Sequence, residues 1–218
     1  MTTKTYDVIL FDLDGTLTDS QEGIINSIQH ALKYFGIIEK DIKNLKKFIG
    51  PPLKDSFMEY YGFDDDKATL AIKKYREYFA VKGIFENKVY PLIPELFEEL
   101  YNRGKKLVVA TSKPTVFAER ILDYFQLTKY LYFIAGSNLD GSRMIKGEVI
   151  AYALTQCGLD SSENVVMVGD RKYDVIGAKE SGLDSIGVLY GFGSPEELEQ
   201  EHPTYIVEDV DGLRKVLL

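Results

Sequence analysis

Two aspartates follow an apolar run near the start of the chain, in the sequence VILFDLDGT of residues 8–16. Residues i and i+2 of a β-strand point to the same side, roughly 6 to 7 Å apart, so we expect Asp12 and Asp14 to share one site. Carboxylates at the end of an apolar strand repel each other and resist the loss of water, unless a cation or a substrate needs them. The pattern therefore favours chemistry, and solvated side chains in an ordinary turn are the alternative.

A second pair of carboxylates, Asp170 and Asp174, follows the apolar run Val165–Val168. Four residues apart in the first turn of a helix, these two side chains would face the same side. Alternatively, they are only N-terminal charges that suit the helix dipole. If the two apolar runs are neighbouring strands, all four aspartates form a cluster of oxygen ligands. Such a set suits a hard cation, above all Mg²⁺.

Two hydroxyl residues and one lysine complete the candidate site. Thr111 and Ser112 follow the apolar run Leu107–Ala110 and precede Pro114, so a helix that starts at the proline could bind a phosphate oxygen beside them. Ordinary helix caps are the alternative for both. Lys146 opens a predicted helix, where a cation opposes the helix dipole, which indicates another reason for its presence. A solvated lysine is the alternative there.

Five short apolar runs alternate with helical stretches along the chain. The predicted strands are Val8–Phe11, Leu107–Ala110, Tyr132–Ala135, Val165–Val168 and Ser185–Leu189. Apolar runs of this length between helices are typical of a parallel sheet covered on both faces, and so of an open α/β fold. Ligands of such sheets bind at the carboxyl ends of the strands. We therefore expect Asp12, Thr111 and Asp170 to lie at one edge.

Residues 19–83 contain no strand-like run. The predicted helices there are 24–35, Asp41–Lys47, Leu53–Tyr61 and Asp66–Val81. We therefore expect an all-helical domain of residues 19–83, inserted into a core domain of residues 1–18 and 84–218. The insert could close over the strand ends like a lid. Its turn at residues 50–52, Gly-Pro-Pro, could select the substrate, with Lys47 or Lys54 nearby, although a plain connector between helices fits equally well.

The composition argues against several classes of protein. The chain has 218 residues and a formal net charge of -8, whereas nucleic-acid surfaces need clustered Lys and Arg. It has no apolar run near the ~20 residues of a membrane span and no signal-peptide core. We expect a cytoplasmic protein with neither nucleic acid nor membrane as a partner, and its oligomeric state stays open. Cys157, the single cysteine, should pack in the core, and His30 and His202 should lie on the surface.

The motifs, taken in order, resemble the four motifs of the haloacid dehalogenase superfamily of phosphatases. They are D-x-D-G-T after the first strand, a Thr/Ser strand end, a downstream lysine, and G-D-x-x-x-D after another strand. The likeness covers essentially the whole chain and implies a Rossmann-like three-layer core with a central parallel sheet, plus a helical cap after strand one. In detail it is similar to the phosphoglycolate phosphatase-like branch. Residues 19–20, 48–53 and 169–174 are most similar to members described as bacterial 5'-nucleotidases.

Two features depart from that pattern. Lys146 is followed by Gly147, where many relatives have proline, and the loop Gly191–Ser194 is a weak signal without an assigned role. True dehalogenases lack the second carboxylate and the metal, so Asp14 and Asp170 argue against dehalogenation.

The resemblance implies Mg²⁺-dependent hydrolysis of a small phosphorylated metabolite, with a nucleoside 5'-monophosphate or 2-phosphoglycolate as leading substrates. Asp12 would attack phosphorus and form an aspartyl-phosphate, while Asp14 would act as general acid and then as general base. Asp12, the backbone carbonyl of Asp14, and Asp170 would hold the metal. A sugar-phosphate mutase or phosphotransferase on the same core, and a non-catalytic ligand-binding relative, are the alternatives.

The resemblance also assigns the residues that would hold the phosphate. Thr111, Ser112 and Lys146 would bind its oxygens as charge spreads over them. Asp174 would act from behind, by orienting Lys146 or a water on the metal.

Overall fold

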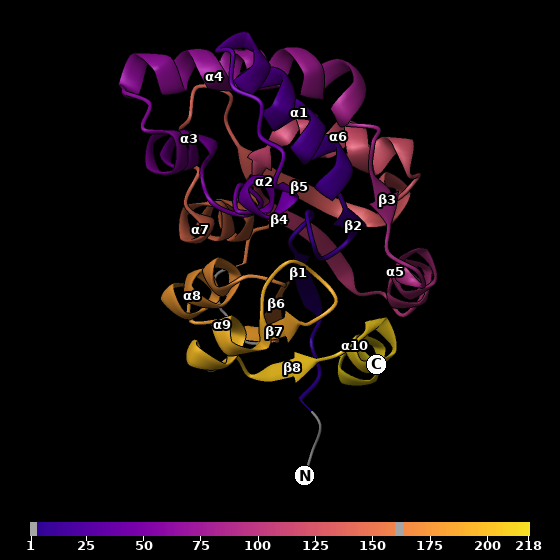
Figure 1. The fold of residues 1–218 in the computed structure, drawn as a ribbon. Coiled ribbons are helices and arrows are strands. Elements are labelled where there is room, and N and C mark those ends of the chain that lie inside the picture. Colours follow the sequence, from indigo (N-terminus) through magenta and orange to yellow (C-terminus); the bar gives the residue numbers. More distant parts are fainter. Residues whose placement is uncertain (1–3, 160–163) are drawn as a thin grey trace. The chain divides into compact units, whose positions relative to one another are not determined.

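The computed structural model describes residues 4–159 and 164–218, and the chain forms two compact units (Figure 1). Unit 1 comprises Met1–Thr18 and Val89–Leu218, and unit 2 comprises Asp19–Lys88. Two short strands, β2 (Thr18–Asp19) and β3 (Lys88–Val89), pair with each other where the chain passes between the units. The action of the helical segment as a lid stays a prediction.

Unit 1 is built on a parallel six-stranded sheet with the strand order β5-β4-β1-β6-β7-β8. The strands are β1 (Val8–Phe11), β4 (Lys106–Pro114), β5 (Leu131–Ser137), β6 (Val165–Gly169), β7 (Asp184–Val188) and β8 (Tyr205–Val207). The predicted α/β fold with its five strands is confirmed. Strand β8 was not predicted because its apolar run, Tyr205–Val207, has only three residues and is shorter than those of the five predicted strands.

Helices cover both faces of this sheet. They are α5 (Ile93–Asn102), α6 (Thr115–Tyr124), α7 (Lys146–Gln156), α8 (Lys172–Glu180), α9 (Pro195–Gln200) and α10 (Val210–Leu217), with a 3₁₀ turn, η2 (Thr128–Tyr130). Successive residues of a strand point to opposite faces. Accordingly, Leu10 packs in a buried cluster with residues of α7 and α8, whereas Phe11 contacts Phe97 of α5. Cys157 belongs to the first cluster, so its predicted core position is confirmed.

Unit 2 is helical throughout its middle part. Its elements are α1 (Gln21–Tyr34), α2 (Ile42–Lys46), α3 (Leu53–Tyr61), α4 (Asp65–Tyr78) and a π-helical turn, η1 (Phe79–Gly83). The predicted insert of helices after β1 is confirmed. One predicted helix was too long, because α4 gives way to η1 after Tyr78. The turn brings Gly83 against α1, where a Cβ atom on Gly23 would lie 1.9 Å from the Gly83 carbonyl oxygen.

Both histidines, His30 and His202, are exposed, as predicted. Among the helices of the described residues, none is both long enough and apolar enough to cross a membrane.

Candidate active site

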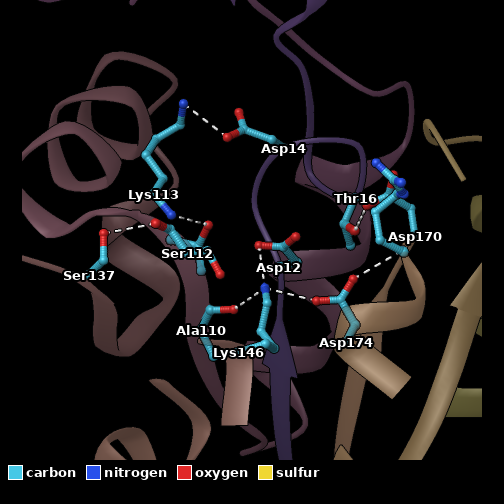
Figure 2. A network of polar contacts seen from close by, with 12 residues as sticks. Asp12, Asp14, Thr16, Ala110, Ser112, Lys113, Ser137, Lys146, Asp170 and Asp174 are labelled. Carbon is cyan, nitrogen blue, oxygen red and sulfur yellow. Dashed lines mark hydrogen bonds and ion pairs between the residues drawn. The ribbon is translucent and has the colours of Figure 1, made fainter. Parts of the chain in front are cut away.

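The two aspartates of the first motif lie just beyond β1, which ends at Phe11. The backbone N–H of Asp12 still donates to the Val168 carbonyl at 2.9 Å, so this residue stays beside β6. The Asp12 carboxylate contacts the ammonium of Lys146 at 2.8 Å, whereas Asp14 contacts Lys113 at 2.9 Å (Figure 2). Strand spacing therefore does not set the directions of the two side chains, and they pair with different cations.

Lys146 is the first residue of α7, and its side chain is buried. Its Nζ contacts Asp12 and Asp174, each at 2.8 Å, and donates to the Ala110 carbonyl at 3.0 Å. Burial opposes the charged form, but the carboxylates of Asp12 and Asp174 outweigh it and raise the pKa of Lys146 above its ordinary value. The alternative of a solvated lysine is wrong, and a charged ammonium joins β1, β4 and α8 at one point.

Three carboxylates crowd around this ammonium. Asp12, Asp170 and Asp174 each offer an oxygen within 4.8 Å of the others. Burial, and then the charges of Asp174 and Asp12, raise the pKa of Asp170 from 3.8 to about 8. Burial likewise raises the pKa of Asp174. One lysine therefore does not balance the negative charge, and a hard cation bound to these oxygens would.

The turn between β6 and α8 brings Asp170 and Asp174 together. Asp170 follows the last residue of β6, and Asp174 lies in the first turn of α8, where it accepts a hydrogen bond from the Arg171 N–H at 3.0 Å. The prediction that both lie in one helical turn is wrong, because the helix begins at Lys172. Asp174 packs directly against the backbone of Gly169. Any side chain at position 169 would prevent this, since a Cβ atom there would lie 2.2 Å from the Asp174 carboxyl carbon.

Thr111 and Ser112 lie inside β4, which continues to Pro114 before α6 begins. The Thr111 hydroxyl is buried and accepts a hydrogen bond from the Lys113 N–H at 3.2 Å. The Ser112 carbonyl accepts one from the Ser137 hydroxyl at 2.8 Å. The two residues therefore precede the helix rather than form its first turn. Their binding of phosphate stays a prediction.

Sequence reasoning missed three features of this site. Lys113 follows Thr111 and Ser112 and had no role assigned from the sequence, although its nearly buried side chain pairs with Asp14. The Thr16 hydroxyl donates to Asp170 at 3.2 Å, and the backbone N–H of Phe192 donates to the other Asp170 oxygen at 2.7 Å. The two glycines of the loop at 191–194 were the only sequence signal for these contacts. The loop, Asp170 and Thr16 are far apart in the sequence, and only the fold brings them together.

Comparison with known proteins agrees with this geometry. Residues 9–188 match the model of a family described as haloacid dehalogenase-like hydrolase, and the chain belongs to that family. A 5'-nucleotidase from Pseudomonas aeruginosa is 50% identical over 97% of this chain and 96% of its own length. The tyrosine-protein kinase PtkA from Mycobacterium tuberculosis is 36% identical over 96% of this chain and 72% of its own length.

A crystal structure of a protein described as a predicted phosphatase, from Clostridium acetobutylicum, superposes on this fold with a TM-score of 0.93. The two sequences are 54% identical, and the match covers 97% of this chain and 98% of the other. More distant relatives are named phosphoglycolate phosphatases. The protein is therefore a phosphatase of this family, a phosphoric monoester hydrolase with an acidic cluster that can hold a metal ion.

Proposed function

We propose that the protein is a Mg²⁺-dependent phosphatase of small phosphomonoesters and that its reaction passes through an aspartyl-phosphate on Asp12. One observation carries this proposal. A largely buried carboxylate, Asp12, lies 2.8 Å from a charged lysine and within reach of two further buried carboxylates, Asp170 and Asp174. The proposed nucleophile and the carboxylates that could hold a cation therefore lie together at the carboxyl end of β1, where ligands of such sheets bind.

In the first half of the reaction, an oxygen of Asp12 forms a bond to phosphorus while the bond from phosphorus to the leaving oxygen breaks. The Asp14 carboxyl gives its proton to that leaving oxygen. In the second half, water attacks the phosphorus and gives a proton to the Asp14 carboxylate. The bond between Asp12 and phosphorus then breaks, which releases inorganic phosphate and restores both aspartates.

The residues that would hold the ion are Asp12 and Asp170 through their carboxylates and Asp14 through its backbone carbonyl. When bound, Mg²⁺ neutralises charge between an anionic nucleophile and an anionic phosphate. The raised pKa of Asp170 supports this assignment, because it reports negative charge that the nearby lysine does not balance. An all-oxygen donor set is also what Mg²⁺ prefers.

The phosphate itself would be held by Lys146, Thr111 and Ser112. The raised pKa of Lys146 supports this role, because a charged ammonium would stabilise the negative charge that the transferring oxygens gain. Asp174 would orient that ammonium, and the 2.8 Å contact between Asp174 and Lys146 supports this role. Fixed donors of this kind need no rearrangement during the reaction.

A nucleoside 5'-monophosphate is the first substrate to test, because the relative named 5'-nucleotidase is 50% identical over nearly the whole chain. A 2-phosphoglycolate is the second, from the motif resemblance. Selection by the turn at residues 50–52 stays a prediction. In unit 2 this turn contains Gly50 with φ of 106° and leads through Pro52 into α3.

The test is a phosphate-release screen over nucleotides, sugar phosphates and phosphoglycolate, with Mg²⁺ and with EDTA. We expect release that EDTA stops and added Mg²⁺ restores. Asp12→Asn should abolish turnover with the fold intact, whereas Asp123→Asn, at an exposed position of α6, should keep the wild-type rate. Mg²⁺-dependent release by folded Asp12→Asn would disprove the nucleophile assignment.

A second candidate is transfer of the phosphoryl group to a hydroxyl other than that of water. The 36% identity to a protein named tyrosine-protein kinase favours it. The same aspartyl-phosphate would then be attacked by a tyrosine or sugar hydroxyl. Mass spectrometry of a tyrosine peptide and a sugar phosphate after incubation with enzyme and phosphoryl donor separates the two, because only transfer adds phosphate to an acceptor.

A further inference from the structure

The loop that follows β7 encloses one carboxylate of the acidic cluster, Asp170. The Phe192 N–H donates to Asp170 at 2.7 Å. A Cβ atom on Gly191 would lie 2.3 Å from the Asp170 Cβ, and one on Gly193 would lie 2.0 Å from the Asp170 carbonyl oxygen. Neither glycine is among those of the described chain with positive φ. Space beside Asp170, rather than backbone conformation, therefore requires glycine at both positions.

The opposite side of Asp170 is held by the turn after β1. The Thr16 hydroxyl donates to the second carboxylate oxygen at 3.2 Å, and a Cβ atom on Gly15 would lie 2.2 Å from Asp170 Oδ2. The Tyr190 hydroxyl donates to the Thr16 carbonyl at 3.0 Å and so connects the turn to the loop. The Tyr190 ring is itself packed against Tyr90, with ring centres 4.9 Å apart. Asp170 is thus held between two joined segments.

We propose that the segment Tyr190–Gly193 positions the Asp170 carboxylate and thereby sets the affinity of the site for its metal ion. This inference rests on the proposed function for the identity of the ion, Mg²⁺. The residues of the segment are positioning residues, since they act through Asp170 and not on the substrate.

Repulsion between carboxylates gives the physical reason for holding Asp170 in place. Asp12, Asp170 and Asp174 each offer an oxygen within 4.8 Å of the others, so the three carboxylates repel one another when they are charged. Without restraint, Asp170 would turn away from the cluster in the absence of a cation, and binding would then include the cost of bringing it back. A carboxylate that is already held in place avoids that cost, and partners behind a ligand typically change metal affinity by about 10- to 100-fold.

The experiment is calorimetric titration of the whole chain with MgCl₂ at neutral pH, after treatment with EDTA and its removal. Gly191→Ala and Gly193→Ala should each weaken Mg²⁺ binding about 10- to 100-fold. Gly212→Ala is the matched control, because it lies on α10 and its added Cβ would meet no atom closer than 3.3 Å. Its dissociation constant should equal that of the wild type.

Tyr190→Phe keeps the test decisive if the alanine variants fail to fold, since it removes only the hydroxyl that ties the loop to Thr16. It should weaken Mg²⁺ binding about 3- to 10-fold, the effect of one lost hydrogen bond. Circular dichroism establishes folding for each variant. Wild-type affinity in the folded variants would overturn the inference alone. Absence of Mg²⁺ binding to the wild type would overturn both the inference and the proposed cofactor.

Discussion

Replacing Asp170 by asparagine should make the metal-free protein more stable. The wild-type side chain is buried, and that burial together with two neighbouring carboxylates raises its pKa from 3.8 to about 8. An asparagine fits the same surroundings. Its amide oxygen can accept from the Phe192 N–H, and its amide nitrogen can donate to the Thr16 hydroxyl, which also has lone pairs.

The size of the effect follows from the proton that the folded protein must bind. At pH 7 the buried carboxyl is mostly protonated, because its folded pKa is about 8. Protonating a group with an ordinary pKa of 3.8 costs about 1.36 kcal/mol per pH unit, which gives about 4 kcal/mol at pH 7. We expect Asp170→Asn to recover about 2 to 4 kcal/mol, a large share of a total stability of about 5 to 15 kcal/mol.

The sign of the pH dependence separates this cause from a packing effect. Because the folded pKa of Asp170 lies above the unfolded one, its contribution to stability is fully present below about pH 4 and is lost as the pH rises to about 8. The advantage of the asparagine variant should therefore shrink to about 1 to 2 kcal/mol at pH 5. Added Mg²⁺ should stabilise the wild type and leave the variant unchanged, since only the wild type keeps the ligand.

Urea unfolding in EDTA at pH 5 and pH 7 measures these differences. Asp123→Asn, exposed on α6, is the control and should match the wild type at both pH values. A variant less stable than wild type at pH 7, or an advantage that does not change between the two pH values, would refute the electrostatic reasoning.

Three further predictions concern single side chains. Lys146→Met should abolish phosphate release. It should also lower the free energy of unfolding in urea by about 3 to 5 kcal/mol, since it leaves buried carboxylates without their cation. A stability loss below about 1 kcal/mol would contradict this prediction. Lys113→Met should slow hydrolysis of an alkyl phosphate more than that of p-nitrophenyl phosphate, because a misplaced Asp14 matters most for a poor leaving group; equal losses would argue for direct substrate binding. Burial raises the pKa of Cys157, so a thiol reagent should label it only on unfolding, and rapid labelling of the native protein at pH 7 would count against the packing.

The sheet could be predicted from the sequence because burial on both faces produces continuous apolar runs. All four residues of β1 are buried, as are all five of β6. Strand β8 lies at the edge of the sheet and has only three residues, Tyr205–Val207, which is too short a run to give that signal. The end of α4 was misplaced because the apolar spacing continues beyond Tyr78, whereas the contact of Gly83 in the π-helical turn with Gly23 of α1 depends on tertiary packing.

The site was predictable in its residue types and less so in its contacts. A lysine at a helix start opposes the dipole, and that conflict correctly marked Lys146 as unusual. The sequence had no comparable signal for the pairing of Lys113 with Asp14, because lysine and aspartate are common on surfaces and their separation along the chain is large. The contacts of Asp170 with Thr16 and with the Phe192 N–H depend in the same way on strands that are neighbours only in the folded sheet.

The acidic cluster links the stability of this protein to its chemistry. Three buried carboxylates beside one lysine cost folding free energy in the absence of a cation, and the raised pKa of Asp170 is the measure of that cost. The same imbalance favours a divalent cation, since binding removes the repulsion that folding created. Removing a carboxylate from the cluster should therefore stabilise the metal-free protein and lower its affinity for the metal ion. Across substitutions at Asp170 and Asp174, these two quantities should change in opposite directions.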